Sequence, residues 1–365
     1  MSAASQPAAE AGSRVPLINR IRARAGEKKI PMHTLLELTN NCNLWCRHCY
    51  ITDRPAAQEL ELGEIKSVID QLAEAGCLFL TLTGGDPLMR KDFFTIAAYA
   101  RQKDFSFSLF TNGTLLTPAA ADRLKELAVE RVEISLLGAK AATYEAISGV
   151  PGSFERAVNG IRLLRERGIT VQAKTPWLKL NIDESEEIFS LAESLGVSFR
   201  GGNLVIHRRD GSMEPVSLAA DEGQLRAMRQ RRLDRHPMKE MPPDPPPIPE
   251  EAKKVIIPCG IGQTSVRIDS YGNVYPCASV NVKLGNLKTT PFGAIWQGSE
   301  ELARIRAIRL SDLTECSTCR LWLRCTRCAG LALMETGSLL GPSLQACKVT
   351  HALQQFLEEK RCEFH

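Results

Sequence analysis

Short apolar stretches alternate with longer amphipathic stretches between residues 33 and 206. The apolar stretches predict six buried strands, which cover residues 33–39, 78–83, 105–111, 131–137, 169–175 and 197–206. The stretches between them have helical spacing, and several open with Ser, Thr or Asp and end at Gly, so they predict helices. Strands that alternate with helices imply right-handed βαβ units and a parallel sheet, either doubly wound or a partial barrel.

Polar residues gather where the predicted strands end. Along the chain these positions are Cys42, the Gly-Gly-Asp-Pro segment 84–87, the Thr-Asn-Gly segment 111–113, Ser135 and Lys174. In barrels and open α/β sheets alike, ligands bind at the carboxyl ends of parallel strands. We therefore expect these five places to converge on one pocket.

The composition is that of a soluble enzyme. The 365 residues suit one large domain and a smaller one, and 44% are hydrophobic without any run long enough to span a membrane. The net charge of +4 is small, and the basic segment 229–236 lacks interleaved aromatic residues, so we expect neither nucleic acid nor a membrane as partner. Residues 1–32 lack the apolar block of a signal peptide, which predicts a frayed, partly helical tail and a cytoplasmic location.

Twelve cysteines are many for a reducing compartment, where clustered thiols more often bind metal than form disulfides. Three of them, Cys42, Cys46 and Cys49, lie within eight residues and are called the cysteine triad below. A structural zinc site prefers four ligands in two close pairs, which three close thiols fit poorly. A four-iron cluster on three thiolates fits better, because one iron stays open to a substrate or cosubstrate.

The C-x3-C-x2-C spacing of the triad, followed after the next strand by Gly84, Gly85 and Asp86, resembles the radical S-adenosylmethionine (SAM) superfamily. The resemblance implies a partial (β/α)6 barrel at residues 33–235. It also implies a [4Fe-4S] cluster on the triad whose open iron binds SAM. Reductive cleavage of SAM would yield a 5′-deoxyadenosyl radical that abstracts hydrogen from an unactivated C–H bond, while the protein places the substrate and excludes water.

The resemblance also assigns cofactor contacts. The residues expected to contact SAM are His48, Gly84, Gly85, Asp86, Thr111, Asn112, Ser135 and Lys174. His48 would lie against the adenine, and the glycine pair would let the backbone approach the methionyl part. Asp86, where the family commonly has Glu, would accept a hydrogen bond from the SAM amino group. Lys174 would either pair with the SAM carboxylate or snorkel from its strand end.

Residues 236–254 include seven prolines among nineteen residues, which predicts an extended linker or strap across one face of the first domain. Seven cysteines lie beyond it, between residues 259 and 347. In isolation, the C-x2-C-x5-C-x2-C run would suit zinc knuckles. Downstream of a radical SAM core, the pattern resembles an α+β SPASM domain, at residues 255–350, with a β-hairpin at 267–277. A C-terminal helix or tail would follow at 351–365.

The SPASM resemblance implies two auxiliary iron–sulfur clusters, expected to be [4Fe-4S]. The outer cluster would be held by Cys316, Cys319, Cys325 and Cys347. The inner cluster would be held by Cys259, Cys277 and Cys328, which leaves its fourth ligand unassigned. Two residues separate Cys325 from Cys328, where similar proteins usually have three. This departure from the family pattern bears on the role of Cys328 as a ligand.

Members of this subgroup mostly modify ribosomal peptides or proteins. Residues 135–164 resemble peptide-maturing members, and Ala278 stands where sulfatase-maturing members have an Asp, so our main hypothesis is a peptide maturase that crosslinks, epimerises or oxidises its substrate. Two alternatives stay open: radical tailoring of a small cofactor such as a tetrapyrrole, and an iron–sulfur electron carrier without catalysis. The Gly-Gly-Asp-Pro and Thr-Asn-Gly placements argue against the carrier, which needs no SAM pocket.

The partners expected from this resemblance are a peptide or protein substrate and an electron donor such as flavodoxin or ferredoxin. Residues 1–32 are too short for a domain that recognises a leader peptide. Such a domain would therefore have to be a separate protein.

Overall fold

The computed structural model describes residues 16–52, 58–238, 240 and 242–364. All six predicted strands are present and parallel: β1 (His33–Thr39), β2 (Phe79–Gly84), β3 (Ser106–Thr111), β4 (Arg131–Ser135), β5 (Val171–Pro176) and β6 (Ser198–Gly202). They pair in their sequence order, and the sheet stays open at β6. The predicted partial barrel is confirmed.

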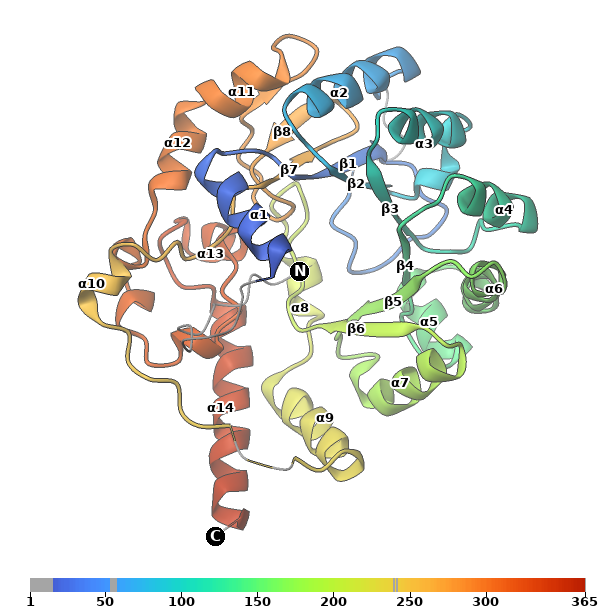
Figure 1. Cartoon of the computed structure of the whole chain (residues 1–365). Helices are drawn as coiled ribbons and strands as arrows, with labels where there is room; N and C mark the ends of the chain where they lie inside the picture. The colour runs from blue at the N-terminus through green and yellow to red at the C-terminus, as the bar shows by residue number, and fades with distance from the viewer. Residues whose placement is uncertain (1–15, 53–57, 239, 241, 365) are drawn as a thin grey trace.

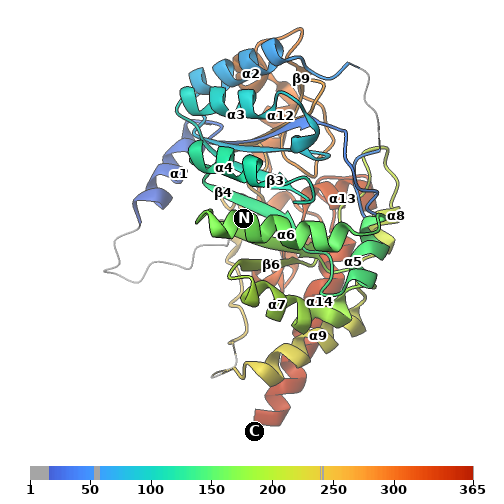
Figure 2. The ribbon, with the colours of Figure 1, turned by 90° about the vertical axis from the view of Figure 1, so that its right-hand side faces the viewer.

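The five predicted helices are also present: α2 (Leu62–Glu74), α3 (Phe93–Gln102), α4 (Pro118–Glu126), α6 (Ser153–Glu166) and α7 (Ser185–Ser194). The barrel region further contains α1 (Leu17–Glu27), η1 (Pro87–Met89), α5 (Ala141–Ser148), η2 (Ile182–Glu184), α8 (Glu214–Ser217) and α9 (Glu222–Arg235). Figure 1 shows the crossover helices on the outer face of the curved sheet. Seen from the helical side, α2, α3, α4, α6 and α7 lie one below another (Figure 2).

Side-chain alternation along the strands separates an apolar face from a polar one. Leu36, Leu82, Leu109 and Ile134 are fully buried in the main hydrophobic cluster, together with residues of α2, α3 and α6. These side chains therefore point toward the helices. The residues between them, such as Glu133, point to the concave side of the sheet. The concave side of the sheet, called the inner wall below, is therefore polar, while the opposite face is apolar.

The C-terminal region extends the barrel sheet. β7 (Ser265–Ile268) pairs parallel with β1, and β8 (Asn273–Tyr275) and β9 (Gly285–Asn286) follow antiparallel, which gives a nine-stranded sheet. The predicted β-hairpin is therefore confirmed as β7–β8. Gly272 at its turn has φ +82°, a conformation that favours glycine.

The remaining elements are mostly short: α10 (Glu250–Lys253), α11 (Phe292–Gly298), α12 (Glu300–Ala307), η3 (Leu310–Asp312), η4 (Cys316–Thr318), η5 (Trp322–Arg324), α13 (Ala329–Thr336) and the longer α14 (Leu344–Phe364). The expected boundary at residue 350 falls inside α14. Asp244 of the Pro-rich segment forms ion pairs with Arg324 (3.2 Å) and Arg361, so this part of the segment packs on η5 and α14. These contacts are with the C-terminal region and not with the first domain, across which a strap was expected. Within the described residues, no helix has both the length and the apolar character to cross a membrane.

Candidate functional site

The loop after β1 carries the cysteine triad and is fixed by backbone hydrogen bonds. The Trp45 and Arg47 amides donate to the carbonyl oxygens of Ser148 (2.8 Å) and Ile147 (3.0 Å), at the end of α5. Gly149, which follows α5, has φ +72°, and a Cβ there would lie 2.9 Å from the Trp45 carbonyl oxygen. Close contact with α5 therefore holds the backbone that presents the three thiols.

The glycine pair after β2 is required by the neighbouring loop. A Cβ on Gly84 would lie 2.2 Å from the Thr39 carbonyl oxygen, and one on Gly85 would lie 2.2 Å from the Asn41 carbonyl oxygen. The Gly85 amide donates to the Thr39 oxygen at 2.7 Å. A side chain at either position would push the triad loop away. Sequence reasoning assigned these glycines to the approach of SAM alone and missed this packing role.

Asp86 joins the ends of β2 and β3 from a fully buried position. Its Oδ2 accepts hydrogen bonds from Thr111 Oγ1 (2.7 Å) and the Asn112 amide (2.9 Å), and its Oδ1 accepts one from the Leu88 amide (3.0 Å). Burial raises the pKa of Asp86, and these hydrogen bonds oppose that rise. The carboxylate accepts hydrogen bonds from three protein donors and thereby connects the ends of β2 and β3. Its contact with SAM stays a prediction.

Asn112 connects the end of β3 to the triad. Its Nδ2 donates to Asn43 Oδ1 (2.9 Å) and lies 3.7 Å from Cys42 Sγ. Thr114 completes the network, because its hydroxyl donates to Asn112 Oδ1 (2.6 Å) and accepts from Asn43 Nδ2 (2.8 Å). The structure therefore brings together the ends of the first three strands, as the sequence predicted. Asn43 and Thr114 were missed, since short polar loop residues resemble ordinary turns.

His48 lies in the triad loop with an unused ring nitrogen. Within the described part of the chain, its buried Nδ1 has no hydrogen-bond partner. Burial lowers the pKa of His48 to about 4, so the ring is neutral at physiological pH. A neutral ring with a free nitrogen suits the contact with adenine that the family resemblance implies.

Ser135 and Lys174 are neighbours across β4 and β5, where they pair in register. Lys174 Nζ lies 3.3 Å from Glu133 Oε2 and 3.3 Å from the centroid of the Phe110 ring. Burial lowers the pKa of Lys174 to about 8. Glu133 opposes this shift, whereas the nearby Arg200 and Arg131 add to it. Lys174 thus belongs to the polar inner wall, and its pairing with the SAM carboxylate stays a prediction.

The inner wall carries more cations than anions. Glu37, fully buried on β1, pairs with Arg209 and lies 3.6 Å from Arg267, while Glu133 lies 3.1 Å from Arg131. The cations of this wall, called the cationic lining below, are Arg131, Lys174, Arg200, Arg209 and Arg267. Asp269, whose charge also acts on Arg209, is a third carboxylate beside them. Three carboxylates against five cations leave a net positive wall among the described residues. Sequence reasoning missed it, although charged residues at alternate positions of apolar strands were its visible signal.

The C-terminal cysteines form two groups in space. Burial, and then the nearby Cys277 and Cys328, raise the pKa of Cys259, and these three thiols are called the inner set. Burial raises the pKa of Cys347 to about 11, and the nearby Cys325, Cys316 and Cys319 add to this rise. These four thiols are called the outer set. The structure thus groups the cysteines as the SPASM resemblance implied and brings Cys328 to the inner set.

Both sets suit a cluster by donor chemistry, since each consists of thiols alone. Among the described residues, no three His, Cys, Asp or Glu side chains surround a point where one metal ion would sit. A four-iron cluster holds its ligand sulfurs several ångströms apart, so its thiolates need not meet around one point. Grouping by proximity is therefore the more relevant observation for these cysteines.

Comparison with known proteins decides the family. The Radical SAM superfamily model matches residues 36–192, and that of SPASM, an iron–sulfur cluster-binding domain, matches residues 259–326. An AdoMet-dependent heme synthase of Methanosarcina barkeri is 33% identical over 328 residues, which are 83% of this chain and 93% of that protein. The chain belongs to the radical SAM superfamily. Its SPASM domain places it in the subgroup that the sequence indicated.

Two further comparisons differ in what they support. An AdoMet-dependent heme synthase of Nitratidesulfovibrio vulgaris is 31% identical over 323 residues, 82% of this chain and 88% of that protein. Streptococcus suis SuiB, solved with its precursor peptide SuiA, has a TM-score of 0.68 and 16% identity, and the match covers 92% of this chain and 82% of SuiB. At that identity the likeness to SuiB shows the fold alone. Membership of this radical SAM subgroup confirms SAM and [4Fe-4S] clusters as the cofactors.

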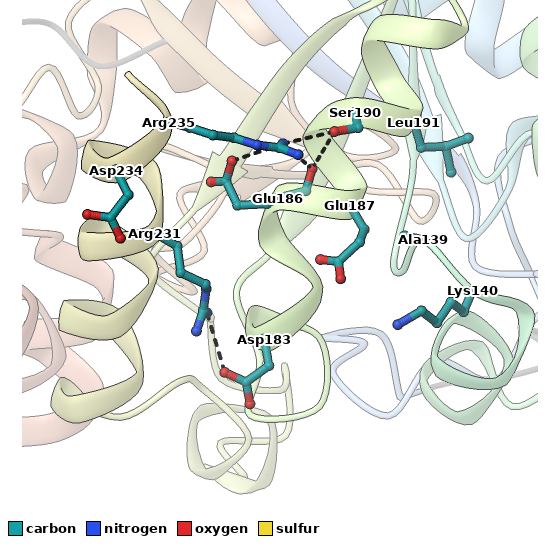
Figure 3. Close-up of a pocket in the computed structure, with 10 residues that line it drawn as sticks. All are labelled: Ala139, Lys140, Asp183, Glu186, Glu187, Ser190, Leu191, Arg231, Asp234 and Arg235. Carbon is teal, nitrogen blue, oxygen red and sulfur yellow. Dashed lines mark hydrogen bonds and ion pairs between the residues drawn. The ribbon is translucent and has the colours of Figure 1, made fainter. Parts of the chain in front are cut away.

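A separate groove of about 610 Å³ lies between α7 and α9 (Figure 3). Its lining residues are Ala139, Lys140, Asp183, Glu186, Glu187, Ser190, Leu191, Arg231, Asp234 and Arg235. Arg235 donates to Ser190 (3.0 Å) and Glu186 (3.3 Å), and Arg231 donates to Asp183 (3.4 Å). The groove contains none of the predicted site residues, and pairing between its own residues accounts for several of its charges.

Proposed function

We propose that this radical SAM enzyme acts on a tetrapyrrole that bears several carboxylates, and that it converts propionate side chains into vinyl groups as heme synthesis requires. The cationic lining is the observation that carries this proposal. Its support from relatives is that two AdoMet-dependent heme synthases align with most of the chain. The tetrapyrrole alternative from the sequence is thus preferred over its main hypothesis, a peptide maturase.

The charge of the inner wall matches such a substrate. Arg267 is 2% exposed and Lys174 is partly buried, and buried cations need counter-charges. Glu37, Glu133 and Asp269 balance only three of the five cations in the lining. A tetrapyrrole presents propionates around an apolar ring, and arginine binds carboxylates through paired hydrogen bonds. Arg200, which forms no ion pair within the described residues, is the cation most available to a substrate carboxylate.

The proposed conversion balances with the groups that the chain provides. When bound, the triad cluster and SAM supply the radical that takes a hydrogen atom from the propionate carbon next to the ring. The bond to the carboxyl carbon then breaks, carbon dioxide leaves and a carbon–carbon double bond forms. One electron must leave the substrate for each propionate. We assign its removal to the clusters that the inner and outer sets would hold, with the triad holding the SAM-binding cluster.

The peptide maturase hypothesis retains two supports, the resemblance of residues 135–164 and the shared fold with SuiB. Neither concerns the charge of the inner wall. A peptide substrate would need acidic side chains to use the cationic lining, whereas a tetrapyrrole carries its carboxylates inherently. The lining therefore favours the tetrapyrrole.

Binding of iron coproporphyrin III, a tetracarboxylic porphyrin, tests the proposal. We expect the anaerobically reconstituted protein to bind it at least about tenfold more tightly than its methyl ester, because one charge-assisted hydrogen bond contributes about 1.5–3 kcal/mol. Titration followed by absorbance measures both affinities. Arg200→Gln should narrow the difference, while Arg123→Gln on α4 is the matched surface control. Equal affinity for acid and ester, or no binding of either, would contradict the proposal.

A further inference from the structure

Ser279 lies between two thiols of the inner set. Its hydroxyl oxygen is 3.4 Å from Cys277 Sγ and 3.3 Å from Cys328 Sγ, although Cys328 is 49 residues further along the chain. The backbone amide of Ser279 also donates to Cys277 Sγ at 3.4 Å. One residue therefore presents two hydrogen-bond donors to two sulfurs of the same set.

The packing of α13 fixes this arrangement. Cys328 is the residue before the first turn of α13, and Gly330 lies in that turn. A Cβ on Gly330 would lie 2.0 Å from the Ser279 carbonyl oxygen, so only glycine lets the helix approach the Ser279 backbone so closely. On the other side, Val280 is fully buried in a small apolar cluster against which Cys259 and Cys277 pack. The Ser279 loop is held from both sides.

The distances separate two possible roles for the hydroxyl. A fourth ligand of a four-iron cluster would bind its own iron, at a distance from the other three ligand atoms. Ser279 Oγ instead lies within hydrogen-bond distance of two ligand sulfurs, which is the position of a donor. Because the Ser279 amide already donates to Cys277 Sγ, the hydroxyl hydrogen can be donated to Cys328 Sγ.

We propose that Ser279 is a positioning residue for the inner auxiliary cluster: its amide and hydroxyl donate to Cys277 and Cys328 and raise the reduction potential of that cluster. Hydrogen bonds to ligand sulfurs stabilise the more negative, reduced state, and they are among the features that set cluster potentials. The same contact keeps Cys328 in the inner set despite its shortened spacing. This inference does not depend on the identity of the substrate.

The test is a redox titration of the reconstituted holoenzyme followed by electron paramagnetic resonance. SAM is included so that its effect on the triad cluster distinguishes that signal. Ser279→Ala should retain the iron content of the parent and shift one auxiliary signal to a more negative midpoint potential. Ser279→Thr keeps a hydroxyl and should restore the parent value.

The matched control is Ser317→Ala. Ser317 lies between two outer thiols in the sequence, but its hydroxyl donates to the Thr314 carbonyl oxygen (3.4 Å). Its auxiliary potentials should stay unchanged. A parent-like potential in Ser279→Ala would overturn the inference. Loss of iron in Ser279→Ala that Ser279→Cys restores would also overturn it, because residue 279 would then be a ligand. None of these measurements uses a substrate, so their failure is distinct from failure of the proposed function.

Discussion

The loop that carries the cysteine triad is held by α5 and by a polar network at three strand ends, whereas most of the C-terminal cysteines lie on short 3-10 turns and in loops, with Cys347 in the first turn of α14. Asp86, Thr111 and Asn112 form their contacts through protein groups alone. In the outer set, η4 and η5 are three residues long each and supply little regular hydrogen bonding. The two regions would thus depend on iron to different degrees.

One chain thus contains a preformed site and a metal-dependent one. The barrel buries a continuous apolar core, so loss of its cluster should remove activity and leave the fold. The outer-set region has a small core around Leu310 and Leu313, so its stability should come largely from ligand bonds. The following predictions test that contrast.

Substitution of a triad thiol should have the largest effect. Cys46→Ala is expected to abolish formation of 5′-deoxyadenosine, because two remaining thiolates hold the cluster poorly, while circular dichroism stays that of the folded parent. Cys77→Ala is the control, since Cys77 is a buried core thiol whose pKa burial raises to about 11. Parent-level SAM cleavage by Cys46→Ala would refute the assignment of the triad.

Loss of an outer thiol should instead change the structure. Cys325→Ala, or removal of iron with a chelator, is expected to speed hydrogen exchange across residues 310–347 by at least about tenfold, with the barrel strands protected as before. Mass spectrometry of deuterated peptides measures both regions in one sample. Equal acceleration in the barrel strands would erase the proposed difference between the two regions.

Asp86 should show an intermediate effect on both binding and stability. Asp86→Ala leaves the Thr111 hydroxyl and Asn112 amide unpaired, at a cost of about 1–3 kcal/mol for a buried donor. We expect SAM affinity to fall by about one to two orders of magnitude, measured by equilibrium binding beside urea unfolding. Asp86→Asn, which keeps an acceptor oxygen, should recover part of the stability. Unchanged SAM affinity would show that the segment 84–87 serves only as a turn and does not bind SAM through Asp86.

The smallest effect is a dependence on pH through Lys174. Its ordinary pKa of 10.5 is lowered to about 8 by burial, so the ammonium is lost as pH rises through 8. Affinity for a carboxylate substrate should fall over that range. Deprotonation between about 8 and 10.5 should also stabilise the fold, because the folded state disfavours the buried charge. Lys174→Met should remove this pH dependence, and an unchanged profile in that variant would exclude Lys174 as its source.

Strand and helix periodicity predicted the barrel well, because β1 to β5 each bury apolar side chains and each crossover helix has one buried face. The expectation of a buried strand was wrong for β6, none of whose residues is buried. The placement of Cys42, Gly84 and Asn112 near one another followed from the rule that ligands bind at strand ends. The pairing of β7 with β1 was not predicted, since a short strand gives no sign of which edge it joins. The partners of Asp86 were also missed, because its role depends on contacts 25 residues away.

Substrate choice was the weakest part of the prediction. The segment at 135–164 pointed to peptide maturation. Apart from Ser135 on β4, however, it forms α5, which contacts the triad loop, and α6, which packs on the sheet, and it contributes none of the cations of the inner wall. The charges that discriminate between substrates lie on separate strands, and only folding brings Glu37, Arg209 and Arg267 together.

Anaerobic turnover with SAM, a reductant and iron coproporphyrin III tests whether the enzyme performs radical chemistry on a carboxylated tetrapyrrole. Liquid chromatography with mass spectrometry measures 5′-deoxyadenosine and the porphyrin in the same sample. We predict that the porphyrin loses carbon dioxide from its propionates and that one 5′-deoxyadenosine forms for each propionate lost. Formation of 5′-deoxyadenosine beside an unchanged porphyrin would contradict the proposed function, while it would leave the chain a radical SAM enzyme with another substrate.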